Sequence, residues 1–296
     1  GRERRSAPND VPSLPEMDRW VNVASLGVVG DGTTDVTDLL QEAVDRHDVL
    51  YFPTGWYRLT RTLRLRPESK LIGLHPFATQ LCLSESTPAF SGFGTPVPVL
   101  ESSRGGDNVL NGIGINTGAY NYRAVGVKWM AGADSYLNDV KFVGGHGGLW
   151  KPVPGQEEPR WWGRGERRIS SPSNPVRDQG MDQAWDRQYW SLWVTDGGGG
   201  TIKDVWTAST YATSGFYAEH TSTPARIYAM SIEHHVRNWK VYCMQTEEES
   251  VESIECQPIE MDACSGMTFA NLYMFRVIRV NRPYRSSVRI RGCRDL

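Results

Sequence analysis

The sequence has no long hydrophobic run and no excess of charge of either sign. No stretch approaches the roughly 18 consecutive apolar residues of a membrane-spanning helix, and the first twenty residues are polar, so we predict neither a membrane span nor a signal peptide within this sequence. Lys and Arg number 32 and Asp and Glu 34, which gives a net charge of −2 and no basic surface. We therefore expect neither nucleic acid nor a membrane as a partner.

Motifs of metal and phosphate sites are also missing. The five cysteines contain no C-x-x-C pair and occupy strand-like apolar positions, so we expect buried free thiols. No His, Cys and carboxylate cluster has the spacing of a zinc site, and no Asp-rich loop resembles a calcium site. The glycine run 197–200 lies between β segments rather than at the start of a helix. We predict no metal and no cofactor.

Short strands and turns fill most of the chain, whose hydrophobic fraction of 39% is sufficient for a core. Residues 1–20 lack periodicity and are predicted to form an extended arm. A short amphipathic helix is predicted over 35–45, with Thr34 or Asp35 capping its start. The apolar positions that predict it are Val36, Leu39, Leu40, Ala43 and Val44. Strands are predicted at 49–52, 57–59, 63–65 and 70–73, and repeatedly from about residue 108.

A weak internal repeat relates the segments 137–142, 202–207 and 269–274. The two offsets between them are nearly equal, and each is close to three periods in the low twenties, which is the spacing typical of stacked solenoid coils. In such a coil we expect aliphatic ladders inside and Asn or Asp at the corners, bonded to turn amides. Asp139, Asp204 and Asn271 share one place in the repeat, so we predict a structural corner role for them.

Residues 150 to 193 interrupt this rhythm with six tryptophans and six arginines, and we predict a loop insertion at about 150–190. Indole rings suit carbohydrate binding because the apolar face of a pyranose can stack on them. Trp161, Trp162 and Trp185 are the predicted sugar-binding residues of this loop. Its arginines would also suit a uronate or sulfated polymer.

The opening of the chain resembles the start of the pectate-lyase-like superfamily of right-handed parallel β-helices. The resemblance is carried by Val-Asn-Val at 21–23, Gly-Asp-Gly-Thr-Thr-Asp at 30–35, Leu-Tyr-Phe-Pro-Thr-Gly-Trp-Tyr at 50–57 and Leu-Ile-Gly at 71–73. It implies an all-β fold, a single-stranded right-handed parallel β-helix (solenoid) with a short N-terminal capping helix, formed by residues 21–296 as one domain. In that fold Asp31, Thr34 and Asp35 belong to the turn and cap before the helix.

Segments of the second half resemble glycoside hydrolase family 55 and its bacterial relatives, at 215–217, 221–224, 227–228, 233–238 and 245–249. The resemblance implies inverting exo-hydrolysis of β-1,3-glucan by an extracellular enzyme that acts on a polysaccharide. Family 55 enzymes generally have two tandem β-helices. We therefore expect a homo-oligomer or a second β-helix outside the present sequence, and the interval from Glu233 to Gln245 is shorter than in the family.

Glycoside hydrolysis needs a carboxylic acid that protonates the leaving oxygen, and crowding of carboxylates can raise its pKa. Glu247, Glu248 and Glu249 form the densest carboxylate cluster. If Val241 and Cys243 point inward, Glu248 points outward, so Glu248 is the preferred general acid and Glu247 the alternative.

Glu233 is the predicted supporting carboxylate or water-positioning residue. Other residues near it are predicted to bind substrate: Gln245, Glu249, His234, His235 and Tyr242. The pair Glu219-His220 is a weaker pattern of the same kind as Glu233 and its histidines.

Two other functions stay open. A polysaccharide lyase would need a base and a cation to stabilise an enolate, for which Arg237, Lys240 and Tyr242 are available. A non-catalytic glycan-binding module, trimeric like a tailspike, would need neither.

Overall fold

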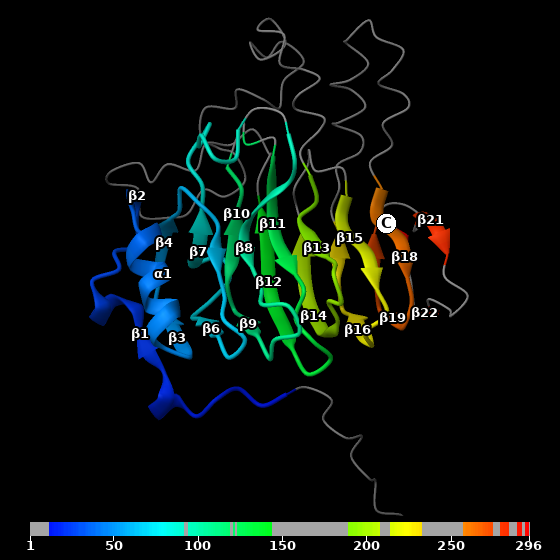
Figure 1. Ribbon diagram of the computed structural model, residues 1–296, viewed down its shortest axis with the longest axis horizontal. Coiled ribbons are helices and arrows are strands. Elements are labelled where there is room, and N and C mark those ends of the chain that lie inside the picture. Colours follow the sequence, from blue (N-terminus) through cyan, green and yellow to red (C-terminus); the bar gives the residue numbers. More distant parts are fainter. Residues whose placement is uncertain are drawn as a thin grey trace, which may run out of the picture.

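The computed structural model describes residues 12–91, 94–118, 121, 123–143, 189–207, 214–232, 257–274, 279–283, 289–291 and 294–295. Within these residues the protein consists of parallel strands in two sheets, with one short α-helix at the N-terminal end (Figure 1). All the strand pairings described below are parallel.

Sheet A has sixteen strands arranged as two columns. The first column contains β1 (Val21–Asn22), β3 (Val49–Phe52), β6 (Lys70–Gly73), β9 (Val109–Asn111), the first halves of β12 (Tyr136–Val143) and β14 (Gly200–Thr207), β16 (Ala225–Tyr228), β19 (Met267–Ala270) and β22 (Arg289–Arg291). The second column contains β2 (Asp31–Asp35), β4 (Gly55–Arg58), β7 (Thr79–Cys82), β10 (Gly114–Asn116), the second halves of β12 and β14, β17 (Ser231–Ile232), β20 (Tyr273–Met274) and β23 (Arg294–Asp295).

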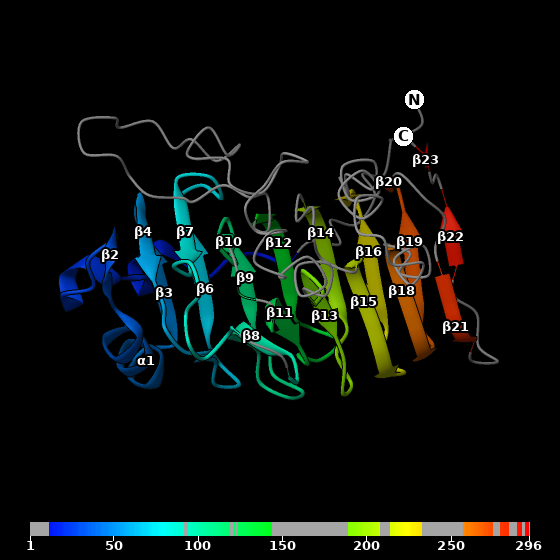
Figure 2. The ribbon, with the colours of Figure 1, turned by 90° about the horizontal axis from the view of Figure 1, so that it is seen from above.

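Sheet B has seven strands: β5 (Leu63–Arg64), β8 (Val97–Glu101), β11 (Ala124–Trp129), β13 (Leu192–Val194), β15 (Ser214–Thr221), β18 (Gln257–Cys264) and β21 (Arg279–Pro283). From β3 onward the chain passes in turn through the first column, the second column and sheet B. Successive passages lie side by side along the stack (Figure 2). The parallel β-sheets predicted from the repeat are therefore confirmed.

Inward side chains form the predicted apolar ladders. In the first column Leu50, Leu71, Leu110, Leu137, Ile202, Ile227 and Phe269 follow one another in register, and all are fully buried. Sheet B contributes a facing ladder of Leu63, Leu100, Val127, Leu192, Phe216 and Ile259, also fully buried. Each such side chain stabilises the fold by about 1.5–3 kcal/mol, so these ladders hold successive coils in register.

The predicted corner residues lie where the first column turns into the second. Asp139, Asp204 and Asn271 have φ angles of 52°, 51° and 54°, and the strand register aligns them with Gly112 and Ala229, which also have positive φ. We call these five residues the corner ladder. The predicted corner position is confirmed. Its physical basis is the left-handed backbone, which Asn and Asp tolerate better than most residues, rather than the expected bonds to turn amides, and the Asp139 and Asp204 carboxylates pair with Lys141 and Lys203.

The period assigned to the repeat is wrong, although the alignment of its segments is right. Leu137 and Ile202 pair directly on adjacent strands, so the offset between them spans one coil rather than three. Ile202 and Phe269, which are almost equally far apart in the sequence, are separated by two coils, because Ile227 lies between them. The number of residues per coil differs because the connections between the second column and sheet B differ in length.

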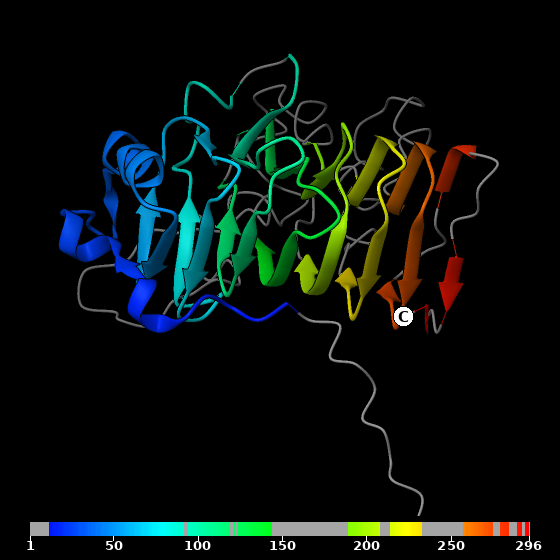
Figure 3. The same cartoon turned by 60° about the horizontal axis from the view of Figure 1, so that its bottom comes forward.

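The N-terminal end begins with two short 3₁₀ helices, η1 (Met17–Arg19) and η2 (Val23–Leu26), followed by α1 (Thr37–Arg46) (Figure 3). The arm is thus not extended throughout, and Trp20 stacks on Tyr51 with ring centroids 5.6 Å apart. The helix begins at Thr37, two residues later than predicted, and its N-cap is Val36, which makes no side-chain cap hydrogen bond. The predicted capping by Thr34 or Asp35 is therefore wrong. Asp35 instead precedes the cap, and its Oδ1 accepts a hydrogen bond from the backbone N–H of Thr37.

Asp31 organises the turn before the helix by accepting hydrogen bonds from the backbone N–H groups of Thr33 and Thr34 and from the Thr34 hydroxyl. Cys82 and Cys264 are buried free thiols, as predicted, whereas the other three cysteines lie outside the residues whose side chains are described. No helix in the described part of the chain is long and apolar enough to span a membrane.

Candidate functional site

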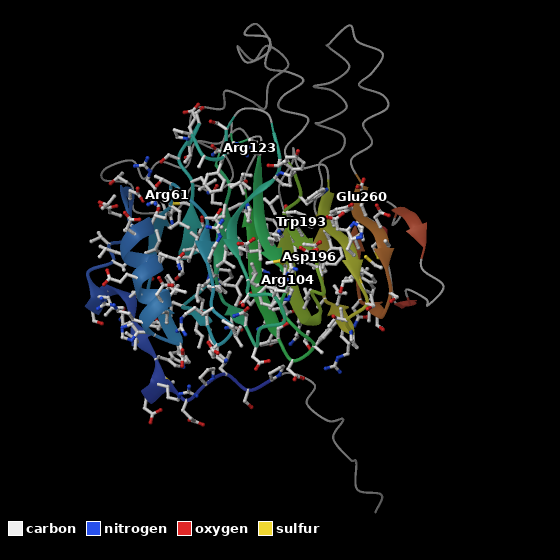
Figure 4. The ribbon with its side chains drawn as sticks, viewed as in Figure 1. Arg61, Arg104, Arg123, Trp193, Asp196 and Glu260 are labelled. Carbon is white, nitrogen blue, oxygen red and sulfur yellow. The ribbon has the colours of Figure 1, made fainter. Side chains whose placement is uncertain are left out.

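One row of outward side chains crosses the outer face of sheet B. The strand register aligns Arg64, Glu101, Lys128, Trp193, Tyr217 and Glu260 on six consecutive strands. They point outward because their neighbours on both sides along each strand, such as Phe216 and Ala218, face the core. The middle of this row is aromatic and both ends are charged. Figure 4 labels two of its members, Trp193 and Glu260.

Glu219 lies beside the aromatic middle of the row. Its Oε1 accepts a hydrogen bond from Trp193 Nε1 at 3.1 Å, and its Oε2 accepts one from the Tyr217 hydroxyl at 3.0 Å. His220 Nε2 lies 3.6 Å from the same Oε2. Both carboxylate oxygens are therefore held by neighbouring side chains, while 19% of the Glu219 side chain stays exposed.

Trp190 extends the aromatic surface from the residues just before β13. Its indole stacks on the Tyr217 ring with centroids 4.1 Å apart and an interplanar angle of 22°, and it contacts the Trp193 ring at 5.1 Å. The preceding Tyr189 contacts Trp190 at 5.3 Å and donates its hydroxyl hydrogen to the carbonyl oxygen of Gly94. These contacts give three aromatic rings fixed positions around Glu219.

Lys128 connects the aromatic surface to the charged end of the row. Its ammonium lies 4.7 Å from the centroid of the Trp193 ring and 3.7 Å from Glu101 Oε1. Arg64 Nε donates to the other Glu101 oxygen at 3.0 Å. A cation over an indole face is attractive, so Lys128 stabilises the Trp193 orientation that lets Nε1 reach Glu219.

Two further carboxylates lie on the next strand, β18. Glu260 is opposite Tyr217 and Asp262 is opposite Glu219 in the parallel register, and both side chains are half-buried. Neighbouring strands are about 4.8 Å apart, so three carboxylates lie on one small part of the sheet.

This environment changes the acidity of Tyr217. Burial, followed by the negative charges of Glu219, Asp262 and Glu260 and the hydrogen bond to Glu219, raises the pKa of Tyr217 well above its ordinary value. The phenol therefore keeps its proton through the pH range in which proteins work, and it remains a donor to Glu219.

The face combines two chemical capabilities. Aromatic rings offer surfaces for the apolar faces of sugar rings, and carboxylate oxygens accept hydrogen bonds from hydroxyl groups. Carboxyl groups close together can also divide the roles of acid and base between them. Among the described residues no group of three or more His, Cys, Asp and Glu side chains has the geometry of a metal site.

The catalytic and substrate-binding residues predicted from the sequence lie outside the described residues, and of the candidates only the weaker pair Glu219-His220 lies within them. Glu233, His234, His235, Tyr242, Gln245, Glu247, Glu248 and Glu249 belong to the segment 233–256, and Trp161, Trp162 and Trp185 belong to the segment 144–188. Their roles therefore stay predictions.

The strands that precede and follow these two segments nevertheless occupy equivalent positions in the stack of coils. Segment 144–188 joins β12 to β13, and segment 233–256 joins β17 to β18. The strands that precede them are connected through β14, where Thr207 pairs with both Phe142 and Ile232. The strands that follow them are connected through Phe216, which pairs with Leu192 and Ile259. Both segments thus lead to the strands of sheet B that carry the aromatic row.

Sequence analysis ranked Glu219 low and missed Lys128, Glu260 and Asp262. The signal was an alternation shared by two segments. In 216–219 apolar residues alternate with Tyr217 and Glu219, and in 259–262 they alternate with Glu260 and Asp262. A period of two places Tyr217 and Glu219, and likewise Glu260 and Asp262, on one face of the sheet.

A hollow of about 470 Å³ lies on sheet A, along the second column and the corner ladder. It is lined by Phe77, Asp139, Lys141, Asp204, Val205, Trp206, Ala229 and Ser231. The Phe77 and Trp206 rings meet edge to face at 5.7 Å, and Lys141 Nζ lies 3.7 Å from Asp139 Oδ1. Trp206 is almost fully buried, so this hollow offers less aromatic surface than the face of sheet B.

Comparison with known proteins supports the resemblance at the start of the chain. Residues 20–143 match the family model described as "Rhamnogalacturonase A/epimerase, pectate lyase-like". This range begins just before β1 and ends with β12, so it covers the N-terminal coils. The resemblance to pectate-lyase-like proteins is thereby confirmed over these residues.

Two fungal proteins are similar to part of the chain. The "Probable glucan endo-1,3-beta-glucosidase" of Arthroderma benhamiae is 32% identical over 94 residues, which is 30% of this chain and 10% of that protein. The "Glucan 1,3-beta-glucosidase" of Cochliobolus carbonum is 30% identical over 93 residues, 30% of this chain and 11% of that protein. The matched part thus spans about a tenth of the length of these relatives.

Among solved structures, an iota-carrageenase in complex with iota-carrageenan fragments aligns with 92% of this chain and 58% of its own. The TM-score is 0.41 and the sequence identity 10%.

Proposed function

We propose that this protein is an extracellular glycoside hydrolase that degrades a polysaccharide, with a β-glucan such as β-1,3-glucan as substrate. The observation that carries the proposal is the outer face of sheet B, where Trp190 and Trp193 lie beside the hydrogen-bonded carboxylate of Glu219. Stacking surfaces next to carboxylates are what sugar binding and acid catalysis require. The names of the two fungal relatives support a glucan substrate.

The mechanism proposed is the inverting one of family 55. Glu248, or else Glu247, protonates the leaving glycosidic oxygen, and Glu233 is the supporting carboxylate. Substrate hydroxyl groups are bound by Gln245, Glu249, His234, His235 and Tyr242, while Trp161, Trp162 and Trp185 add stacking surfaces. The connection of segments 144–188 and 233–256 to sheet B supports a site on this face.

The architecture that we propose for this activity is a right-handed β-helix closed by sheets A and B, with residues 21–296 as one domain. A second copy of the chain or a second β-helix completes the substrate cleft, because one stack of coils presents the aromatic row on an open face of sheet B.

The test is a panel of laminarin, pectin, alginate and a sulfated galactan, assayed for new reducing ends and for ultraviolet absorbance. Reducing ends from laminarin without absorbance are the expected result. Absorbance from an unsaturated product would instead show a lyase, and binding without either signal would show a glycan-binding module. Glu248→Gln and Glu247→Gln, assayed in parallel, locate the acid, because the variant that lacks it loses the release of sugar.

A further inference from the structure

The proposed hydrolysis leaves open which carboxylate takes a proton from the attacking water. In an inverting enzyme this base acts on the face of the sugar opposite the acid, and it must be ionised and held in a fixed orientation. We propose that Glu219 is this base, oriented by Trp193 and Tyr217, and this assignment rests on the proposed hydrolase function.

The first support is the way in which the carboxylate is held. Trp193 Nε1 donates to one oxygen and the Tyr217 hydroxyl to the other, at 3.1 and 3.0 Å. Each carboxylate oxygen can accept two hydrogen bonds, so Oε1 keeps an acceptor position for water, while His220 Nε2 lies 3.6 Å from Oε2. The exposed fraction of 19% lets solvent reach the carboxylate.

The second support is that both donors are themselves fixed. Trp193 lies under the Lys128 ammonium, which also pairs with Glu101. Tyr217 is covered by the stacked indole of Trp190, and it keeps its proton because burial and the adjacent carboxylates raise its pKa. Donors that neither rotate away nor ionise fix the direction of the Glu219 carboxylate.

The third support is the position of the surrounding rings. The partly exposed Trp193 is hydrogen-bonded to Glu219, and the partly exposed Trp190 contacts both Trp193 and Tyr217. The ring surfaces on which a sugar can stack therefore adjoin the residues that hold the carboxylate. The sequence assigned water positioning to Glu233, whereas the geometry of the described residues points to Glu219.

The chemical step balances as follows. The water oxygen forms a bond to the anomeric carbon while Glu219 accepts one water proton. The glycosidic C–O bond breaks, and its electron pair takes the proton of the acid, Glu248 or Glu247. The products are a sugar of inverted configuration and a free alcohol, and the proton on Glu219 returns through solvent to the acid.

The experiment uses the whole chain and the substrate that the glycan panel identifies. Glu219→Gln keeps the size of the side chain and removes its basicity, and we expect kcat to fall roughly 10²–10⁴-fold with KM changed little. Residual activity should lose the acidic limb of the pH–rate profile. Glu68→Gln, the same exchange at an exposed side chain beside Arg66, is the matched control and should keep the parent's rate.

Glu219→Ala with added sodium azide tests the role itself. Azide has no proton to lose, so it attacks the anomeric carbon without a base, and we expect part of the rate to return with a glycosyl azide of inverted configuration as product. Trp193→Phe and Tyr217→Phe keep an aromatic ring at each position and remove one donor each, and each should lower kcat less than Glu219→Gln.

A Glu219→Gln variant that keeps more than a tenth of the parent's kcat overturns the assignment while the hydrolase function stands. If azide restores the activity of Glu233→Gln and does not restore that of Glu219→Ala, the general base is Glu233 and the assignment to Glu219 is wrong. A parent chain that hydrolyses no polymer overturns the proposed function and this inference together. Far-ultraviolet circular dichroism of each variant separates loss of chemistry from loss of fold.

Discussion

Asp139 and Asp204 lie opposite each other on successive coils, and both adopt the left-handed backbone conformation. Their carboxylates face lysines of their own strands, with Asp139 Oδ1 3.7 Å from Lys141 Nζ and Asp204 Oδ2 3.4 Å from Lys203 Nζ. A left-handed residue bends each long strand from the first column into the second without interrupting its pairing on either side. The left-handed residues of the corner ladder therefore allow a single strand to take part in both columns of sheet A.

Ala229 occupies the same corner position with a φ of 53°, where a Cβ atom costs roughly 1–2 kcal/mol. Ala229→Gly removes this cost and raises the entropy of the unfolded chain, so its Tm should stay within about 2 °C of the parent. Ala229→Val adds a β-branched side chain that avoids this conformation, and its Tm should fall by roughly 2–4 °C or more. Differential scanning calorimetry decides the matter, and equal Tm values for the two variants would contradict the explanation.

Much of this fold was predictable because it depends on local patterns. The apolar residues Leu137, Val140 and Phe142, and likewise Ile202 and Val205, occupy the inward positions. The extra residue that interrupts the period of two lies at Asp139 and Asp204, and it identifies the corner. The number of coils was not predictable, because the offset from Leu137 to Ile202 includes a connection whose length sequence periodicity does not encode. Pairing between strands that lie so far apart in the sequence is a tertiary property.

The site was less predictable for the same reason. Glu219 is an ordinary acidic residue in its own segment, and its contact with Trp193, 26 residues earlier, arises only when β13 and β15 pair. Lys128 reaches this group from β11, across the long 144–188 segment. A dense run such as Glu247 to Glu249 is visible in the sequence, whereas a cluster assembled from three strands is not.

Gly126 tests how closely sheet B packs on the second column. A Cβ atom at this position would overlap the carbonyl oxygen of Ser191 and the ring of Phe142. Gly126→Ala should therefore lower the free energy of unfolding by about 1–3 kcal/mol, because overpacking displaces neighbours in a dense interior. Urea unfolding measures the change.

The control for this substitution is Gly105→Asn, at a left-handed glycine with no neighbour within 4 Å of the added Cβ atom. Asn tolerates this backbone conformation, so the unfolding midpoint should stay close to that of the parent. If Gly126→Ala unfolds at the same urea concentration as the parent, the result contradicts the close packing of β11 against its neighbours.

Asp31 should make the N-terminal cap sensitive to acid. Hydrogen bonds from the Thr34 side chain and backbone, and from Thr33, lower the pKa of Asp31 from 3.8 to about 2. A carboxyl group whose folded pKa is lowered contributes stability above its unfolded pKa and loses it as the pH falls toward the folded pKa. The contribution is therefore present above about pH 4 and disappears between pH 4 and 2.

We expect the Tm of the parent to fall more between pH 5 and pH 2.5 than that of Asp31→Asn, which has no carboxyl group to protonate. Thr34→Val removes the hydrogen bond that lowers the pKa most, and its decrease should be intermediate. Asp18→Asn, on the exposed helix η1, serves as the control. Identical pH dependence in all four proteins would show that the Asp31 turn makes no contribution to acid stability.

Trp190 should report directly on sugar binding, because it is the partly exposed ring that covers Tyr217 next to Glu219. Adding a β-1,3-gluco-oligosaccharide should change tryptophan fluorescence, and Trp190→Ala should weaken binding about tenfold, since an aromatic contact contributes about 0.5–1.5 kcal/mol beyond its buried area. Trp20→Phe removes an indole that stacks on Tyr51 beside the first column of sheet A and should leave the affinity unchanged. Titration by fluorescence and calorimetry compares the three proteins. Unchanged affinity in Trp190→Ala, or an equal loss in Trp20→Phe, would place sugar binding away from the outer face of sheet B.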